Sequence, residues 1–319
     1  MILITGAAGF VGRVLVDRLL KDGHKVRVLV SARTHRPGTF PWVNNDQVTL
    51  VQGSLNNIES LHQAMLGVHT VFHLASAQWW GRQRDLQRID VGGTQNLVAA
   101  GRSARIGRLI MLSHLGASPA SAFTLLKIKG QVEEIIKSSG LAFTIFRSGI
   151  VFGPGDTFVN GIAQLLRANP VLYFQPGHGE GLLHPIYIGD LVEALVRSME
   201  NLDTVDQVIS VGGPEYVTYN EMVRTIMRVT RAPRMIVNLP PYLLRFSSRL
   251  TNRFFPYWPL TPQWLDILAS NRTAPMGTLF NVFGIQPARF EDTILTYMPA
   301  RQYRRELAQN LFKRRSQVG

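Results

Sequence analysis

The first half of the chain alternates short apolar runs with segments whose apolar residues recur every three to four positions. The segment 11–23, VGRVLVDRLLKDG, has the period of an amphipathic helix that ends at Gly23 as its C-terminal cap. Strands that alternate with helices form parallel sheets covered on both faces. The pattern therefore predicts a doubly wound α/β domain of the Rossmann type over residues 1–150. Its predicted strands are 1–5, 25–30, 47–51, 70–75, 108–113 and 142–147.

This alternation weakens after about residue 150, where proline and glycine become denser. VISVGG (208–213) predicts one more strand, and TYNEMVRTIMRVT (218–230) predicts a helix. We expect residues 151–319 to form a smaller C-terminal α/β domain for a substrate or a partner, with some segments returning to the sheet of the first domain.

Three glycines, Gly6, Gly9 and Gly12, separate the first predicted strand from the first predicted helix. Glycine permits a tight turn and lets the backbone approach a pyrophosphate, whose charge then lies at the helix N-terminus. A purely structural turn is the weaker explanation, because the flanking strand and helix are those that a nucleotide site requires. The loop predicts dinucleotide binding.

The end of the second predicted strand bears on which dinucleotide is bound. An NAD site usually carries Asp or Glu there, whereas an NADP site accommodates the extra phosphate beside a basic residue. No acid follows this strand, and Arg33 and Arg36 come shortly after Ser31. This favours NADP(H) over NAD(H), with solvated loop arginines as the alternative.

Composition narrows the possible chemistry. The 319 residues include no cysteine, which excludes disulfides, thiolate metal sites and cysteine nucleophiles. The eight histidines lack the helical i, i+4 spacing with a carboxylate that marks zinc motifs, so we expect no metal site. There is no apolar run of about 20 residues and no sign of a signal peptide at the first residues. We therefore expect a soluble or peripheral protein.

The charge is unusual, at +13 with an isoelectric point near 10.6. Such an excess attracts phosphates, anionic lipid or an acidic partner, or only aids solubility. As a helix, residues 243–255 place Leu243, Phe246, Leu250 and Phe254 on one stripe with arginines beside it. The stripe can lie in a membrane interface, dock on a larger complex or pack into its own domain.

Several motifs, in order and spacing, resemble those of the extended short-chain dehydrogenase/reductase superfamily and of its atypical members. They are TGAAGFVG (5–12), FHLAS (72–76), DVGGTQNL (90–97), LSHLGAS (112–118), FRSGIVFGPGD (146–156) and HPIYIGDLVEAL (184–195). Residues 259–271 and 283–299 resemble the C-terminal signature of a narrower group. That group is related to the nucleotide-binding accessory subunit of respiratory complex I.

In active members of the superfamily, a tyrosine and a lysine one helical turn later carry out the proton chemistry. The lysine and the nicotinamide lower the pKa of the tyrosine, so that the phenol can exchange a proton with the substrate. Here Lys129 matches the lysine and Leu125 occupies the tyrosine position. A register shifted by two gives Phe123 and Lys127, which also lacks a hydroxyl.

The resemblance implies a cofactor site built from the glycine loop, the strand ends and the lysine. Its residues are Gly6, Ala8, Gly9, Phe10, Val11, Gly12, Ser31, Arg33, Ser54, Leu55, Leu74, Ala75, Ser76, Ser113 and Lys129. Ser113 and Lys129 are the candidate catalytic residues if the protein is active. Ser54 and Asp90 stand where active relatives often carry Asp and Asn. Trp79 and Trp80 are candidates for stacking on a ligand or, equally, for a lid that packs on the second domain.

Together these features predict an NADP(H)-binding pseudoenzyme that serves as an accessory or assembly subunit of a membrane-associated electron-transfer complex. The alternative is an active NADP-dependent oxidoreductase or an enzyme like the nucleotide-sugar epimerases and dehydratases. Nucleic acid is the least favoured partner, because no RNP-type motif is present. We expect a cytoplasmic location, including the cytoplasmic face of a membrane, or the matrix side in an organelle.

Overall fold

The computed structural model describes residues 1–31, 40–42, 44–78, 82–255, 257–269, 271–299 and 301–312. The chain forms two compact units. The first unit comprises Met1–Ser148 and Gly189–Ser210, and the second comprises Gly149–Ile188 and Val211–Ser316.

The first unit is built on a central sheet with seven strands among the described residues. Their order is β11-β6-β5-β4-β1-β2-β3, and the neighbouring pairs from β6 to β3 are parallel. The strands are β1 (Ile2–Thr5), β2 (Val26–Val30), β3 (Val48–Gln52), β4 (Thr70–His73), β5 (Arg108–His114), β6 (Phe143–Ser148) and β11 (Gln207–Val211). Most of the residues of the central strands are buried, as expected for a parallel sheet covered on both faces.

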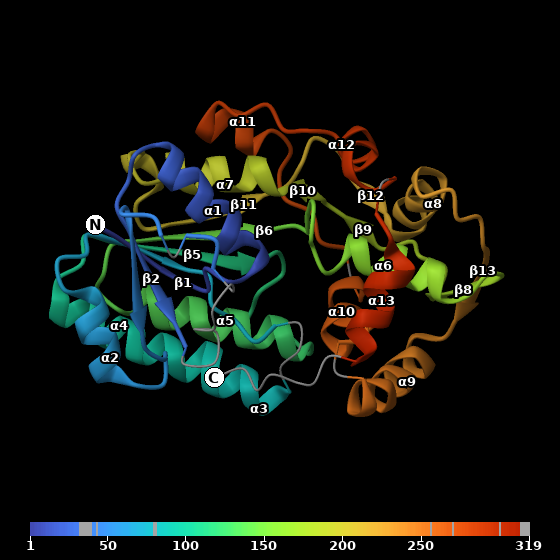
Figure 1. Ribbon diagram of the computed structural model, residues 1–319, viewed down its shortest axis with the longest axis horizontal. Coiled ribbons are helices and arrows are strands. Elements are labelled where there is room, and N and C mark those ends of the chain that lie inside the picture. The colour runs from blue at the N-terminus through green and yellow to red at the C-terminus, as the bar shows by residue number, and fades with distance from the viewer. Residues whose placement is uncertain are drawn as a thin grey trace. The chain divides into compact units, whose positions relative to one another are not determined.

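Helices cover both faces of this sheet (Figure 1). On one face lie α1 (Phe10–Lys21) and α7 (Ile188–Arg197), which are joined by an ion pair of 2.9 Å between Arg18 and Glu193. On the other face lie α2 (Ile58–Met65), α4 (Gly93–Ala104) and α5 (Thr124–Lys137). Shorter elements are α3 (Gln83–Asp85), the π-helical η1 (Leu86–Gly92) that leads into α4, and the 3-10 helix η2 (Leu202–Thr204).

The predicted fold class is confirmed. All six predicted strands are present with ends within about two residues, and the predicted strand at 208–213 is β11 at the edge of the same sheet. The first helix ends as predicted, because Gly23 has a φ of +80° and the His24 N–H donates to the Leu19 carbonyl. These strands could be predicted because each contains a short run rich in Val, Ile, Leu or Phe, although β2, β3 and β6 also contain polar residues.

The second unit contains three two-stranded sheets among its described residues. Their strands are β7 (Val151–Phe152) with β10 (Ile186–Tyr187), β8 (Leu172–Pro176) with β13 (Met235–Leu239), and β9 (Leu182–Leu183) with β12 (Val217–Thr218). The helices are α6 (Val159–Ala168), α8 (Tyr219–Val229), α9 (Pro241–Phe254), α10 (Pro262–Leu268), α11 (Thr278–Phe283), α12 (Phe290–Tyr297) and α13 (Tyr303–Phe312). The helix predicted at 218–230 is α8, which begins with a capping box between Thr218 and Glu221.

No helix in the described ranges combines the length and the apolar character that crossing a bilayer would require.

Candidate functional site

The turn after β1 depends on two glycines that no larger residue can replace. Gly6 has a φ of +77°, and a Cβ there would lie 2.6 Å from the Ala75 nitrogen in the turn after β4. A Cβ on Gly12 would lie 2.3 Å from the Gly6 carbonyl oxygen. The turn, the start of α1 and the end of β4 therefore pack at distances that only glycine allows.

Gly9 leaves the N-terminus of α1 open. It is an exposed N-cap residue with extended backbone, and no side chain caps the helix there. A Cβ on Gly9 would meet only the Gly6 carbonyl oxygen, at 3.1 Å. Because the first N–H groups of a helix carry partial positive charge, this N-terminus can bind a phosphate group. The predicted residues Ala8, Phe10 and Val11 are half-buried around it.

The glycine loop lies where the sheet changes direction. β1 is flanked by β2 on one side and by β4 on the other, so the strand order reverses between β1 and β4. Open α/β sheets bind ligands in the crevice at the carboxyl ends of the strands at such a point. The predicted residues Leu74, Ala75 and Ser76 follow β4 directly, and the Leu74 N–H donates to the Thr5 carbonyl at 3.1 Å. Both sides of the switch point thus carry predicted cofactor residues.

His73 connects β1, β4 and α4 through its two ring nitrogens. Nδ1 lies 2.9 Å from Thr5 Oγ1, and Nε2 lies 3.0 Å from Thr94 Oγ1. Burial, with a smaller contribution from the Lys129 charge, lowers the pKa of His73 to about 3. The imidazole is therefore neutral near pH 7 and holds the strand ends together rather than acting as an acid.

Lys129 is buried in an ion pair beside the end of β4. Its Nζ lies 3.3 Å from Asp90 Oδ1 and 3.1 Å from Ser76 Oγ, and the two charged side chains are only 4% and 2% exposed. Ser76 also donates its hydroxyl to Asp90, and the Ala77 N–H donates to the second carboxylate oxygen at 2.9 Å. Asp90 lies in η1, and π-helical turns are frequent at functional sites. The carboxylate neutralises the ammonium, which an asparagine at this position would not do.

Leu125 lies one turn before Lys129 on α5, as the spacing predicts. Its side chain is 0% exposed, so a packed apolar group fills the position where the resemblance expects a phenol. Lys127, the lysine of the alternative register, is exposed on another side of the helix. The lysine that reaches Ser76 is therefore Lys129.

Ser113 belongs to a second buried polar cluster. Its Oγ donates to Glu133 Oε1 at 2.5 Å, and Glu133 accepts a bidentate pair of hydrogen bonds from Arg147, the shortest at 2.6 Å. A serine hydroxyl carries one proton, and that of Ser113 is directed to this carboxylate. The two candidate catalytic residues, Ser113 and Lys129, therefore bond different carboxylates, Glu133 and Asp90.

Sequence reasoning missed three features of this region. The sequence identifies Asp90 only as a substitution for asparagine and does not predict its ion pair with Lys129. Glu133 stands four residues after Lys129, so helical spacing alone could have placed it on the same side of α5. Arg147 lies on β6, and only the tertiary fold brings it to Glu133.

The other predicted residues that the structure describes follow the carboxyl ends of β2 and β3. Ser31 follows β2, and Ser54 and Leu55 follow β3. Leu55 packs so closely on α4 that a Cβ on Gly93 would lie 2.8 Å from the Leu55 Cβ. Arg33, together with Arg36, Trp79 and Trp80, lies outside the described residues.

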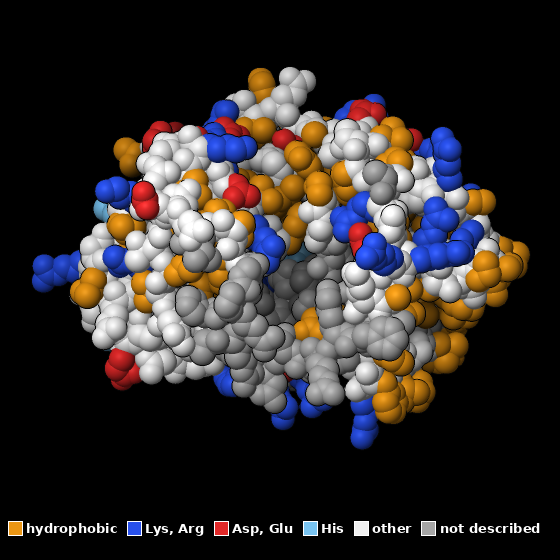
Figure 2. Space-filling model, in the orientation of Figure 1, with side chains coloured by type: hydrophobic (Ala, Val, Ile, Leu, Met, Phe, Trp, Pro, Cys, Tyr) orange, Lys and Arg blue, Asp and Glu red, His pale blue; other side chains and the backbone are white. Residues whose placement is uncertain are grey.

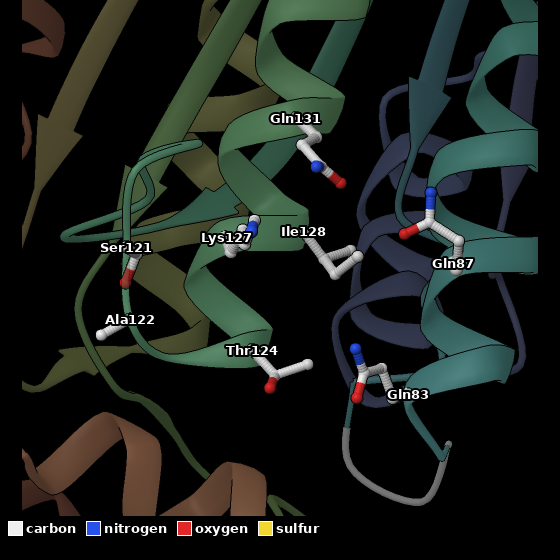
Figure 3. Close-up of a pocket in the computed structure, with 8 residues that line it drawn as sticks. All are labelled: Gln83, Gln87, Ser121, Ala122, Thr124, Lys127, Ile128 and Gln131. Atoms are coloured by element: carbon white, nitrogen blue, oxygen red, sulfur yellow. The ribbon is translucent and has the colours of Figure 1, made fainter.

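A hollow of about 390 Å³ lies between α5 and the α3–η1 segment (Figure 3). Figure 3 shows Ile128 and Gln131 projecting from α5 towards Gln87 on the opposite helix. None of the predicted cofactor residues lines this hollow. It is a surface depression beside α5 and does not replace the site at the strand ends.

Histidines of the second unit also have structural partners. His184 lies 2.8 Å from the Gly213 carbonyl through Nε2, and its Nδ1 accepts from the Ala274 N–H at 3.1 Å. Burial lowers its pKa, which favours this neutral tautomer. Across the described ranges, no group of three or more His, Asp and Glu side chains is placed to hold a metal ion.

Comparisons with known proteins agree with this geometry. Residues 6–158 match the family described as NAD(P)H-binding. A ceramide reductase of Caulobacter vibrioides is 31% identical over 172 residues, which cover 54% of this chain and 53% of that protein. The mitochondrial NADH dehydrogenase [ubiquinone] 1 alpha subcomplex subunit 9 of Mus musculus is 24% identical over 259 residues, which cover 81% of this chain and 68% of that protein.

Among solved structures, the NADPH-dependent quinone oxidoreductase QOR2 of Escherichia coli, complexed with NADPH, superimposes with a TM-score of 0.73. It is 16% identical, and the match covers 92% of this chain and 98% of that one. The match to the ceramide reductase spans about half of that protein's length. These comparisons confirm the resemblance drawn from the motifs, and they confirm the fold.

Proposed function

We propose, given that residues 6–158 match the family described as NAD(P)H-binding, that the protein binds NADP(H) and works mainly by holding it. In this proposal the chain is an accessory or assembly subunit of a membrane-associated electron-transfer complex. When bound, the nicotinamide of such a cofactor supplies hydride transfer. The residues present fit the group, because Gly9 leaves space at an uncapped helix N-terminus where a pyrophosphate can lie.

One observation carries the non-catalytic part of the proposal, namely the α5 face that contains Leu125 and Lys129. A proton relay of the superfamily type needs a phenol one turn before the lysine and a lysine charge that lowers the pKa of the phenol. Here Leu125 is buried and apolar, and Asp90 pairs with the Lys129 ammonium at 3.3 Å. This arrangement supports the proposal that the relay does not operate, while Lys129 and Ser76 retain polar atoms that can hydrogen-bond a ribose.

The accessory role is supported by similarity. The mouse protein, named as an NADH dehydrogenase subunit, aligns with 81% of this chain, which includes residues of both units. We propose that the present protein likewise associates with a membrane-bound complex, as a peripheral component on the cytoplasmic or matrix side.

The preference for NADP(H) over NAD(H) is part of the proposal. The second strand ends at Val30 and is followed by Ser31, with no carboxylate to bond the ribose hydroxyls, and by basic residues in the sequence. We expect NADPH to bind more tightly than NADH by at least tenfold. An Arg33→Asp substitution should abolish that preference, and isothermal titration of both nucleotides measures it.

An active reductase is the second candidate. It is favoured by the 31% identity to a ceramide reductase, a level that the mouse subunit does not reach. The two candidates are separated by following NADPH oxidation with a panel of aldehydes, ketones and quinones. Turnover above background that disappears in Lys129→Ala would support the reductase. Absence of turnover by a protein that still binds NADPH supports the accessory role.

A further inference from the structure

The apolar stripe of α9 faces solvent. Its side chains Leu243, Phe246, Leu250 and Phe254 have exposed fractions of 44%, 69%, 53% and 68%, and the adjacent Tyr242 is 69% exposed. Of the three possibilities for this stripe, packing into its own domain is therefore wrong. We call these five residues the α9 face.

The opposite side of α9 fixes this orientation. Leu244 and Ser248 are its buried residues, and Arg245 forms an ion pair of 2.7 Å with the buried Asp266 of α10. The Asn252 amide donates to the Leu260 carbonyl at 2.8 Å. Since polar anchors hold the inner side, the helix cannot turn the α9 face inward without breaking them.

Positive charge borders the α9 face. Arg249 and Arg253 are exposed one turn apart, next in helical order to Phe246 and Leu250, and neither forms an ion pair with any residue that the structure describes. Residues 240–265 contain three arginines and no acidic residue. The surface is therefore apolar along one line and cationic along its edge.

The apolar surface continues beyond the helix. Figure 2 shows hydrophobic side chains gathered along the edge of the second unit that Figure 1 labels α9, β13 and β8. Phe174 of β8 is 45% exposed and Met235 of β13 is 61% exposed. Exposed apolar surface of this extent marks an interaction site rather than ordinary surface scatter.

We propose that the α9 face lies in the interface of a membrane that contains anionic lipid. A helix of 14 residues is about 21 Å long, and its aromatic and leucine side chains can enter the acyl boundary while the arginines stay among lipid phosphates. Charge complementarity selects this occupant, because the unpaired arginines and the absence of acid suit a uniformly anionic surface. A protein partner would need a matching apolar groove with acids along one side.

This inference rests on the proposed function for its membrane-bound partner, but vesicle binding itself is measured without nucleotide. We would float the full chain with vesicles of phosphatidylcholine alone and with 30% phosphatidylglycerol, using Phe246→Asp/Leu250→Asp as the test variant. The matched control is Phe280→Asp on α11, whose side chain is 60% exposed in the same unit. A third variant, Arg249→Gln/Arg253→Gln, reports on the charges.

We expect the wild type and the control to bind anionic vesicles equally, and the test variant to bind at least tenfold less. The arginine variant should lose most of the difference between anionic and neutral vesicles. Binding by the test variant at the wild-type level would overturn the proposal, since the net charge of +13 alone would then explain attachment. No binding by the wild type would also overturn it.

If the wild type failed to bind vesicles and sedimented as a dimer, while the test variant sedimented as a monomer, a second copy of the chain would be the occupant of the α9 face. NADPH titration of every variant shows whether cofactor binding survives independently.

Discussion

The glycine loop and the Leu125–Lys129 face of α5 belong to one unit but are constrained in different ways. In the loop the requirement is on the backbone, since a Cβ on Gly6 or Gly12 would come within 2.6 Å of neighbouring backbone atoms. On α5 the requirement for chemistry is on side chains, and leucine packs there without any exposed surface. Binding and proton transfer can therefore be lost separately. In our account only the second is lost.

The largest expected effect tests the loop. Gly12→Val would drive a side chain into the Gly6 carbonyl, so we expect a loss of about 4 kcal/mol in the free energy of unfolding and at least a 100-fold loss in NADPH affinity. Gly92→Ala is the control, because a Cβ there meets only the Gln87 carbonyl oxygen at 3.8 Å. Chemical denaturation and nucleotide titration measure both. Equal behaviour of the two variants would mean that the loop is not constrained by its glycines.

The next effect tests the charge pair on α5. Lys129→Met leaves the buried Asp90 carboxylate without a cationic partner, and Asp90→Asn leaves the buried Lys129 ammonium without an anionic one. Each substitution should therefore cost about 3 kcal/mol of unfolding free energy. The double variant should lose at least 1 kcal/mol less than the sum of the two. Denaturant unfolding of the four proteins gives the coupling. Strictly additive losses would show that the two groups do not interact.

Restoring the phenol should have a smaller effect on stability and should not by itself create an enzyme. Leu125→Tyr overpacks a fully buried position, at a cost of about 2 kcal/mol. We expect no carbonyl reduction with NADPH, because Asp90 still offsets the Lys129 charge, and measurable reduction only when Asp90→Asn is added. Leu126→Tyr, at a neighbouring buried position, controls for the packing change. Turnover by Leu125→Tyr alone would mean that the Asp90 pair does not suppress the relay.

The smallest expected effect is a difference between the two units in how their stability depends on pH. Burial raises the pKa of Asp156, in the second unit, to about 7 against opposing hydrogen bonds from the backbone of Gly153, Asn160 and Val159. The folded state keeps a proton that the unfolded chain releases above about pH 4, so this stability is present at low pH and is lost as pH rises through 7. Burial lowers the pKa of His73, in the first unit, to about 3. The unfolded chain gains that proton below about pH 6.5, so this contribution is lost as pH falls.

Each unit of separation between folded and unfolded pKa corresponds to about 1.4 kcal/mol. Moving from pH 7 to pH 5 should therefore increase protection of α6 amides and decrease protection of β4 amides in hydrogen exchange, after correction for the intrinsic rate. Asp156→Asn should remove the first change and leave the second. A change of the same sign in both units would contradict the assigned pKa shifts.

Sequence alone was sufficient for the elements whose signal is local. The mainly apolar runs predicted β1 to β6, and the spacing of Gly6, Gly9 and Gly12 predicted the turn that the structure shows. The Lys129–Asp90 pair was not predictable, because 39 residues separate the partners and only the π-helical turn brings the carboxylate to the lysine. The outward orientation of the α9 stripe was also undecided, since an amphipathic pattern shows that one face is apolar and not what covers it. The ion pair between Arg245 and Asp266, which fixes the orientation of α9, becomes apparent only in the folded structure.

The most direct test of the central claim, that the protein holds a nucleotide without turning it over, uses the protein as isolated. Heat denaturation followed by mass spectrometry identifies any released nucleotide, and exchange against labelled NADPH gives its residence time. We predict close to one NADP(H) per chain with exchange over hours. An empty site, or exchange within seconds together with carbonyl-dependent oxidation of NADPH, would contradict the account and identify a working reductase.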